Sequence, residues 1–362
     1  MQIGIIGLPT SGKTTIFNAL TRGTAPVEAF SSGKLEIHTA SIEVPDARVG
    51  ILSGMFRPRK TIHAQVQYND IGGLARGIGE KGGMEGGLLN QIVQNDELIY
   101  VIRAFEDPNV PHLEGSVNPA RDLELLDTEL ILNDLGVVER RLERLKTSLT
   151  KGGGSPADRE SFKLEQTLLL RYKEALESGT PLRDVDASAA ERKMVRGLAL
   201  TTIKPTLVVL NAGEEPADVE KAVKYEHRKT IIVGLQGKLE MELAQMSEHE
   251  AKEFLADFGI QEPGLPRMIR LSYNLLGLHS FFTVGEDEVR AWTVPIEATA
   301  VDAAGAIHTD LARGFIRAEV VAYEDLIRTG SLAEAKKHGV LRLEGKEYVV
   351  KDGDILNIRF SI

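Results

Sequence analysis

The first twenty residues constrain the fold more than any other part of this 362-residue chain. An apolar run at Ile3–Ile6 predicts a buried strand, and apolar residues at helical spacing from Thr15 to Leu20 predict a helix. Between them lies Gly7-x-x-x-x-Gly12-Lys13-Thr14, the spacing of a Walker A phosphate loop. Glycines let backbone N–H groups turn toward phosphate oxygens, and a helix N-terminus favours an anion. We therefore predict a nucleoside triphosphate site formed by Leu8, Pro9, Thr10, Ser11, Gly12, Lys13, Thr14 and Thr15.

A second motif, Asp70-x-x-Gly73, follows a strand pattern about fifty residues downstream. In phosphate-loop enzymes such an aspartate holds Mg²⁺, usually through water, while the glycine N–H contacts the γ-phosphate. The lysine of the loop reaches the β- and γ-phosphates, and the Thr hydroxyl binds the metal. The predicted catalytic residues are therefore Lys13, Thr14, Asp70 and Gly73, and the predicted magnesium ligands are Thr14 and Asp70.

The base-binding loop is predicted where a third motif follows the apolar strand 205–210. Guanine-specific GTPases carry Asn-Lys-x-Asp there, because the Asp carboxylate accepts from two adjacent N–H groups of guanine. This chain has Asn211-Ala212-Gly213-Glu214, without the Lys and with a longer acid, so the guanine preference is lost and ATP is favoured over GTP. The predicted base contacts are Asn211, Ala212 and Glu214, with Gly234 and Leu235 at the end of the next strand; Glu214 either orients this loop or is a solvated carboxylate.

The order of apolar patterns predicts an α/β fold with a doubly wound parallel sheet, interrupted once and followed by a second domain. Leucines at helical spacing predict an antiparallel helical hairpin in residues 119–199, broken near residues 151–156. Short strands from residue 277 onward, including 347–350 and 355–358 around a hairpin turn at Lys351–Asp354, predict a small α+β domain. The predicted domains are 1–118 with 200–276, then 119–199, then 277–362.

Composition restricts the classes of function. The net charge of −10 gives no global attraction to nucleic acid, so any RNA contact needs a local basic patch. The basic run Arg140–Lys151 at the hairpin tip is either such a patch or a solvated helix face. There are no cysteines, no apolar stretch as long as a membrane span, and no room for a signal peptide before the first strand. We expect a cytoplasmic monomer that does not bind membranes.

The whole chain resembles the YchF, or Obg-like ATPase, family of translation-factor-related P-loop NTPases. The resemblance rests on the three motifs above and on a specific C-terminal set: Glu288–Thr293, Ile307–Asp310, Gly314–Glu319, Leu343–Lys346 and Lys351–Asp354. It implies a G domain, a helical insertion and a C-terminal TGS domain of ubiquitin-like β-grasp fold. It also implies ATPase rather than GTPase activity, Mg²⁺ as cofactor, and the ribosome as partner. RNA contact would then involve the hairpin tip or the TGS-like domain, where Arg290, Trp292, Arg313 and Arg317 are candidates, although a strand Trp is typical of a core.

Three departures from the family pattern, and one departure from the pattern of many GTPases, bear on mechanism. Thr10 replaces the Asn that supports K⁺ in related proteins, which puts potassium activation in doubt, and Lys34 replaces the Mg²⁺-sensing Thr of switch I. Without cysteine, the redox response reported for the family cannot use a thiol. Leu74 stands where many GTPases place a water-orienting Gln, so intrinsic hydrolysis should be slow. Two alternatives stay open: a ribosome-associated GTPase, and a ribosome- or RNA-binding module with a vestigial nucleotide site.

Overall fold

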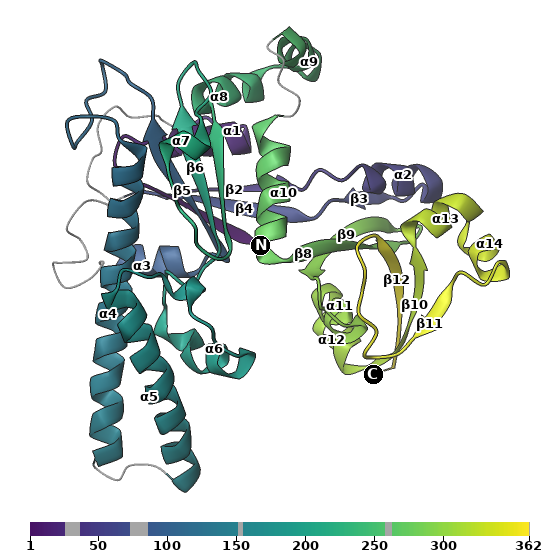
Figure 1. Ribbon diagram of the computed structural model, residues 1–362. Coiled ribbons are helices and arrows are strands. Elements are labelled where there is room, and N and C mark those ends of the chain that lie inside the picture. The colour runs from purple at the N-terminus through teal and green to yellow at the C-terminus, as the bar shows by residue number, and fades with distance from the viewer. Residues whose placement is uncertain (26–36, 73–85, 151–154, 258–262, 362) are drawn as a thin grey trace. The chain divides into compact units, whose positions relative to one another are not determined.

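The computed structural model describes residues 1–25, 37–72, 86–150, 155–257 and 263–361. The chain forms two compact units (Figure 1). Unit 1 comprises Met1–Ser41 and Gln67–Met268, and unit 2 comprises Ile42–Val66 and Ile269–Ile362. The domain boundaries predicted from the sequence lie at residues 118, 199 and 276, and none of them lies near residue 42, where the chain passes from unit 1 to unit 2. The structure therefore adds one feature that the sequence patterns do not indicate: a short N-terminal segment folds with the C-terminal part of the chain.

Unit 1 contains a six-stranded sheet in the order β2-β4-β1-β5-β6-β7. Its strands are β1 (Gln2–Ile6), β2 (Ile37–Glu43), β4 (Gln65–Ile71), β5 (Glu97–Ala104), β6 (Thr206–Ala212) and β7 (Thr230–Leu235). From β4 through β7 every neighbouring pair is parallel. Parallel strands need crossover connections that cover both faces, which explains why β5 and β6 are buried almost throughout. Their carboxyl ends share one edge, where ligands bind in such sheets.

Helices of unit 1 connect these strands. They are α1 (Lys13–Thr21), α3 (Gly86–Val93), α7 (Val219–Ala222), α8 (Gly237–Gln245), α9 (Glu248–Asp257) and the first five residues of α10 (Gly264–Leu276), whose remainder belongs to unit 2. One core cluster joins Ile6, Tyr100 and Leu210 of the sheet to Leu126 and Leu130 of the long helix α4 (Pro119–Thr150). None of the described helices combines the length and the apolar character needed to cross a membrane.

Unit 2 contains a mixed sheet in the order β11-β10-β12-β8-β9-β3. Its strands are β3 (Lys60–Ile62), β8 (Leu278–Val284), β9 (Glu288–Pro295), β10 (Phe315–Ala322), β11 (Arg342–Glu344) and β12 (Asp354–Phe360). The antiparallel pair β8–β9, the parallel pair β8–β12 and the helix α11 (Ala300–Ile307) form the β-grasp arrangement that the family resemblance implies. Short helices α12 (Thr309–Arg313), α13 (Tyr323–Thr329) and α14 (Leu332–Lys337) complete this part, and β3 with α2 (Ala47–Phe56) comes from the N-terminal segment.

The prediction of a strand at residues 347–350 is wrong. Only an isolated bridge between Thr299 and Val349 forms there. The backbone of this stretch bonds to the residues that precede α11, because Ala300 N donates to Tyr348 O and Val350 N donates to Ala298 O. Residues 351–354 do form a turn, closed by a bond from Asp354 N to Lys351 O, but it leads from this bridge into β12 and is not a hairpin.

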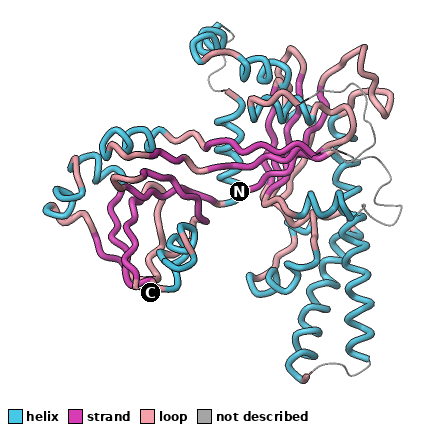
Figure 2. The backbone as a smooth tube through the Cα atoms, turned by 180° about the vertical axis from the view of Figure 1, so that it is seen from behind, coloured by secondary structure: helices cyan, strands magenta, loops and turns pink. Residues whose placement is uncertain are grey.

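The helical hairpin consists of α4 and α5 (Pro156–Glu177), which run side by side (Figures 1 and 2). Its interior is apolar and includes Val138, Leu145, Leu169 and Tyr172. The second helix begins with a capping box in which Ser155 and Asp158 satisfy each other's backbone N–H groups. The short helices η1 (Leu182–Asp184), α6 (Ala189–Val195) and η2 (Arg196–Leu198) return the chain to the sheet.

A fully buried carboxylate, Asp134 of α4, attaches the hairpin to the segment that leads into β6 of the sheet. It accepts hydrogen bonds from the backbone N–H groups and the hydroxyls of Thr201 and Thr202, at 2.8 to 3.0 Å. A buried carboxylate is costly unless such donors replace its hydration. The donors precede β6, so this one side chain holds the middle of a 32-residue helix against the start of a core strand.

Replacing Asp134 with Ala leaves those donors buried without an acceptor. We expect Asp134→Ala to reduce the free energy of unfolding by about 3 kcal/mol, because unsatisfied buried donors keep their full desolvation cost. Urea denaturation followed by circular dichroism measures the change. Exposed Glu143→Ala on the same helix is the control and should stay within about 0.5 kcal/mol of the wild type. Equal stability of the two variants would contradict the role given to Asp134.

Candidate functional site

The phosphate loop joins β1 to α1, and its two glycines are sterically required. Gly12 has φ +88°, and a Cβ atom there would lie 2.1 Å from Nδ2 of Asn211. A Cβ atom on Gly7 would lie 2.4 Å from the carbonyl oxygen of Val101. Either contact is too short for any side chain, so the backbone can follow this path only with glycine. The loop therefore presents main-chain groups at the carboxyl end of β1.

Thr10 also lies in the left-handed region, with φ +62°, which is uncommon for a β-branched residue. Its hydroxyl accepts a long hydrogen bond of 3.4 Å from the guanidinium of Arg103, a buried residue of β5. That guanidinium also donates to the carbonyl oxygens of Phe105 and Val110. Asn tolerates this conformation better than Thr does. The backbone of Thr10, at the position where the family pattern has Asn, is therefore strained, and the hydrogen bond from Arg103 helps to hold it.

Lys13 begins α1 and folds back over the loop. Its Nζ donates to the carbonyl oxygens of Gly7, at 3.2 Å, and Leu8, at 3.0 Å. Burial lowers the pKa of Lys13 to about 8, although the nearby charge of Asp70 opposes this shift. Two neutral carbonyl partners compensate a buried ammonium poorly. An anionic phosphate would compensate it better, which makes this amine a binding group for negative charge.

Thr14 and Asp70 meet although 56 residues separate them: the Thr14 hydroxyl donates to Oδ2 of Asp70 at 2.8 Å. Asp70 is 4 % exposed, and its Oδ1 is buried without a hydrogen-bond partner among the described residues. Nδ1 of His38 on β2 lies 3.7 Å from the other carboxylate oxygen. A buried carboxylate oxygen without a donor, beside a hydroxyl, suits a hard divalent cation such as Mg²⁺. The predicted pair of metal ligands therefore does lie together and fits the ion.

Residues beside this pair stabilise its strand. Thr39 on β2 donates to Oδ1 of Asn69 at 2.9 Å, and Asn69 donates to Asn95 at 2.7 Å. The described residues contain no group of three or more His, Cys, Asp or Glu side chains that could hold a metal. A metal ion at this site would therefore depend on Thr14, on Asp70 and on the phosphates of the bound nucleotide. The predicted residues Lys34, Gly73 and Leu74 lie outside the described residues.

The base loop lies directly against the phosphate loop. Nδ2 of Asn211 donates to the carbonyl oxygen of Ser11 at 3.0 Å, and its Oδ1 accepts from Gly237 N at 3.2 Å. Ala212 is buried beside it, and β6 and β7 pair in a register that brings Leu235 opposite Asn211 and Gly234 opposite Leu210. The Glu214 side chain is exposed, and its carbonyl oxygen accepts from Gln236 at 2.5 Å. The predicted residues thus gather at one edge, with Asn211 connecting three segments.

Phe105 is a site residue that the sequence motifs do not include. It follows β5, and its ring lies 3.9 Å from the point where Gly12 would carry a Cβ atom. Its own Cβ atom is 3.4 Å from the corresponding point on Gly213. The Arg103 guanidinium lies 4.5 Å from the ring centroid. An aromatic ring between the phosphate loop and the base loop is placed to stack on a base. The only signal in the sequence is an aromatic residue directly after a buried strand.

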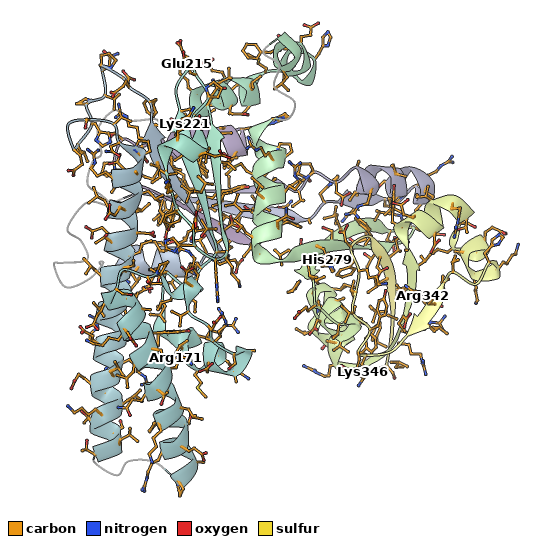
Figure 3. The ribbon with its side chains drawn as sticks, in the orientation of Figure 1. Arg171, Glu215, Lys221, His279, Arg342 and Lys346 are labelled. Carbon is orange, nitrogen blue, oxygen red and sulfur yellow. The ribbon has the colours of Figure 1, made fainter. Side chains whose placement is uncertain are left out.

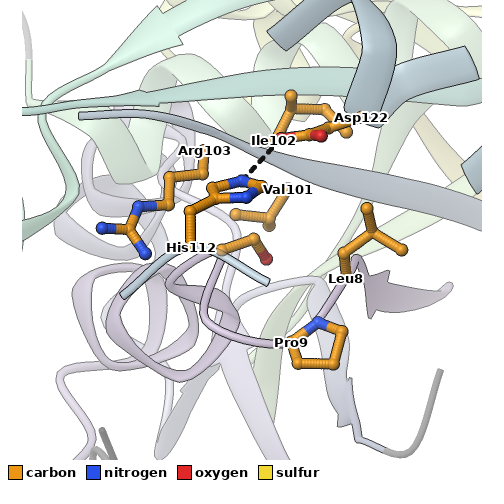
Figure 4. A pocket seen from close by; sticks show the side chains of 8 residues that line it. Leu8, Pro9, Val101, Ile102, Arg103, His112 and Asp122 are labelled. Atoms are coloured by element: carbon orange, nitrogen blue, oxygen red, sulfur yellow. Dashed lines mark hydrogen bonds and ion pairs between the residues drawn. The ribbon is translucent and has the colours of Figure 1, made fainter. Parts of the chain in front are cut away.

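A small cavity lies beneath the phosphate loop (Figure 4). It measures about 10 Å³, roughly the space of one water molecule, and Leu8, Pro9, Ser11, residues 101–103, His112 and Asp122 line it. Nε2 of His112 and Oδ2 of Asp122 are 2.8 Å apart, and Arg121 also bonds to Asp122. The Ser11 hydroxyl is buried without a hydrogen-bond partner in the described structure. This cavity is too small for a nucleotide, which would bind on the outer side of the loop.

A parallel sheet, a glycine-dependent phosphate loop and a Thr–Asp pair at its edge define the class of P-loop nucleoside triphosphatases. Residues 2–133 match the family model MMR_HSR1, described as "50S ribosome-binding GTPase". Residues 278–361 match the model YchF-GTPase_C, described as "Protein of unknown function (DUF933)".

The chain also matches curated relatives and a solved structure over almost its whole length. The chain is 41 % identical to a Bacillus subtilis protein named "Ribosome-binding ATPase YchF", with 100 % of both chains covered. Its identity to the Escherichia coli O157:H7 protein of the same name is 38 %, covering 100 % of this chain and 99 % of that one. The solved Schizosaccharomyces pombe YchF GTPase is 28 % identical, with a TM-score of 0.80 over 99 % of this chain and 97 % of that one. The chain belongs to the YchF family.

The lowered pKa of Lys13 predicts proton uptake when a nucleotide binds above pH 8. In the free protein Lys13 loses its proton as pH rises through about 8, and a bound phosphate raises that pKa again. Affinity for ATP should therefore fall by only about twofold from pH 7 to 8, and by up to about tenfold per pH unit above pH 8. Calorimetry at pH 8.5 in two buffers of different ionisation enthalpy measures the uptake directly.

Two controls test whether Lys13 is the group that takes up the proton. Uptake should be close to zero at pH 7, where free Lys13 is already charged. It should also vanish at pH 8.5 in Lys13→Arg, whose guanidinium does not titrate in this range. Equal apparent binding enthalpies in both buffers at pH 8.5 would show that Lys13 is not the titrating group.

Proposed function

We propose that this protein is a Mg²⁺-dependent ATPase of slow intrinsic turnover that acts as a nucleotide switch on the ribosome. The observation that carries the proposal is the convergence of Lys13, Thr14 and Asp70 at the carboxyl edge of the parallel sheet. A vestigial site would not need two sterically required glycines, a lysine with a lowered pKa and a carboxylate oxygen that has no donor among the described residues. These features cost stability, and a bound nucleotide offsets that cost.

The residues divide the work by chemistry. Lys13 and the loop N–H groups would balance phosphate charge, and the Gly73 N–H would contact the γ-phosphate. Thr14 and Asp70 would hold Mg²⁺, which neutralises charge on the phosphates when bound. Leu74 offers no group that orients water, which supports a slow intrinsic rate. Potassium activation is not part of the proposal, because Thr10 has no amide oxygen to bind the ion.

Adenine would lie between the base loop and Phe105. The loop supplies the Asn211 amide, which is already fixed by Ser11 and Gly237, and the Phe105 ring supplies a stacking surface. Ala212, Gly234 and Leu235 form the apolar floor beneath it. The Glu214 side chain is exposed, so it supplies no buried carboxylate that would accept from guanine N1–H and N2–H. We infer that the selectivity for adenine arises from this missing acceptor.

The partner is inferred from the relatives, whose printed names say that they bind the ribosome. Two surfaces could contact ribosomal RNA. On unit 2, the Arg290 guanidinium lies 4.0 Å from the Trp292 ring centroid, and Arg342 and Lys346 are exposed (Figure 3). Toward the hairpin tip Arg141 pairs with Glu165, which leaves the exposed Arg140, Arg144 and Lys146 among the described basic residues. A ribosome-associated monomer of the cytoplasm is the setting we propose.

GTP is the second candidate substrate. It is favoured by the description of the model that matches residues 2–133, which names a GTPase. The structure does not exclude it by shape, because the two purines stack alike on an aromatic ring. The distinction therefore rests on the hydrogen-bonding edge of the base, which only a binding experiment with both nucleotides resolves.

Equilibrium titration with fluorescent ATP and GTP analogues tests the proposal. We expect ATP to bind at least tenfold more tightly than GTP in the presence of Mg²⁺, because guanine would leave two N–H donors unpaired. Lys13→Ala should abolish binding of both, while the exposed Lys193→Ala on α6 should bind like the wild type. Preference for GTP would move this protein to the GTPases, and no binding to either nucleotide would leave a scaffold with an inactive site.

A further inference from the structure

Residues 42–66 leave the sheet that carries the nucleotide site and fold with unit 2. The segment begins at the end of β2 and returns to the start of β4, the strand that ends with Asp70. Within unit 2, β3 extends the sheet by pairing with β9, and Arg59 N and Lys60 N donate to Glu286 O and Asp287 O. The helix α2 packs against β8 and β9, and its residues Val49 and Leu52 are fully buried. The inserted segment is thus part of the fold of unit 2.

Arg48 fastens this segment to the C-terminal turn. Its guanidinium forms a bidentate pair with Asp46, the N-cap residue of α2, and bonds to Asp352 at 2.8 and 3.2 Å. Oδ1 of Asp352 also accepts from Ser280 N at 3.1 Å on β8. The guanidinium lies 5.0 Å from the Phe282 ring centroid. Burial opposes ionisation of Asp352, but its bonds to Arg48 outweigh this and lower its pKa. One side chain therefore connects α2, the turn before β12 and β8.

The connections between the inserted segment and the strands β2 and β4 are very short. Only Val44 and Pro45 separate the end of β2 from Asp46, and Pro45 has a fixed φ. On the return path only His63 and Ala64 separate β3 from β4. Val44 N donates to Ala64 O at 2.8 Å, which holds the outgoing and returning chains together. An extended strand already rises about 3.3 Å per residue, close to the full reach of the chain, so it cannot lengthen further and passes a displacement along its axis to its other end. A flexible linker would absorb such a displacement, and this chain has none here.

We propose that Arg48 is a positioning residue for the nucleotide site, acting through the inserted segment 42–66 and β4 on Asp70. The inference rests on the proposed function, since it concerns the carboxylate that would hold Mg²⁺. A partner that binds unit 2 and shifts α2 or β3 then changes the affinity for Mg²⁺ with ATP. By linkage, binding of Mg²⁺ with ATP changes the affinity for that partner by the same factor. The two units communicate through the covalent chain itself.

The test compares two arginines of unit 2 that each pair with a carboxylate. Arg48→Met keeps an apolar stem over Phe282 but loses both ion pairs, whereas Arg359→Met removes the pair with Glu319 on β10, outside the inserted segment. ATP affinity is measured for the full chain with Mg²⁺ and with EDTA. We expect Arg48→Met to weaken Mg²⁺-dependent binding about fivefold or more and to leave binding in EDTA unchanged, because only the metal-bound mode uses Asp70. Arg359→Met should match the wild type in both.

A milder variant and a second readout guard against simple unfolding. Asp352→Asn retains a hydrogen-bond acceptor for Arg48 and should show a smaller loss with the same dependence on Mg²⁺. Hydrogen exchange of the α2 amides should slow when Mg²⁺ and ATP bind to the wild type, and this change should disappear in Arg48→Met.

The outcomes separate the two proposals. If the wild type binds ATP, Lys13→Ala abolishes binding, and Arg48→Met binds ATP with Mg²⁺ as tightly as Arg359→Met, then the relay is wrong and the proposed function stands. An equal loss for Arg48→Met in Mg²⁺ and in EDTA also overturns the relay, since it indicates general damage. If the wild type binds no ATP, the proposed function fails and the relay fails with it.

Discussion

The contact between Asn211 and the phosphate loop is the constraint on which the site depends. The Asn211 amide lies so close to Gly12 that no Cβ atom fits, and its two ends bond to Ser11 and Gly237. β6, the phosphate loop and α8 are therefore held by one buried side chain. Gly237 is subject to the same constraint, because a Cβ atom there would lie 2.5 Å from Oδ1 of Asn211. Base loop and phosphate loop thus keep one fixed relation, and a nucleotide can contact both.

The charged groups of the site lose hydration that hydrogen bonds within the protein do not fully replace. Lys13 is half-buried beside carbonyl oxygens, and this desolvation lowers its pKa, while Asp70 keeps one oxygen without a donor among the described residues. A site organised for stability would pair these groups directly or exclude them. The binding of a charged ligand satisfies both groups, so ligand binding and stability are coupled. The same reasoning does not apply to Asp134, whose donors all come from the protein.

The sequence predicted much of this site because its motifs specify backbone paths. Gly7, Gly12 and Lys13 at fixed spacing after a buried strand leave few alternatives, and the apolar runs of β5, β6 and β7 predict a parallel sheet whose edge collects the motifs. Phe105 escaped prediction because an aromatic residue after a strand is common, and its role depends on a distance across the sheet. The strand expected at residues 347–350 failed because its neighbour in space precedes α11, and alternation of residues does not identify the partner.

The inserted segment 42–66 could not be predicted for a related reason. Its helix and short strand have ordinary patterns, and nothing local shows that Arg48 pairs with Asp352, a residue 304 positions away. Only the assembled fold shows that the path from β2 to β4 passes through unit 2. This path gives the nucleotide site a connection to unit 2 that does not depend on any flexible linker.

The central claim is that Thr14 and Asp70 hold the metal of a bound triphosphate, and pulsed electron paramagnetic resonance of bound Mn²⁺ tests it most directly. With ATP and Mn²⁺ on the wild type, the account predicts ³¹P couplings from the nucleotide and a metal that stays bound at stoichiometric concentration. Asp70→Asn should lose most of the bound metal while ATP still binds in EDTA. Unchanged metal affinity and unchanged couplings in Asp70→Asn would contradict the account.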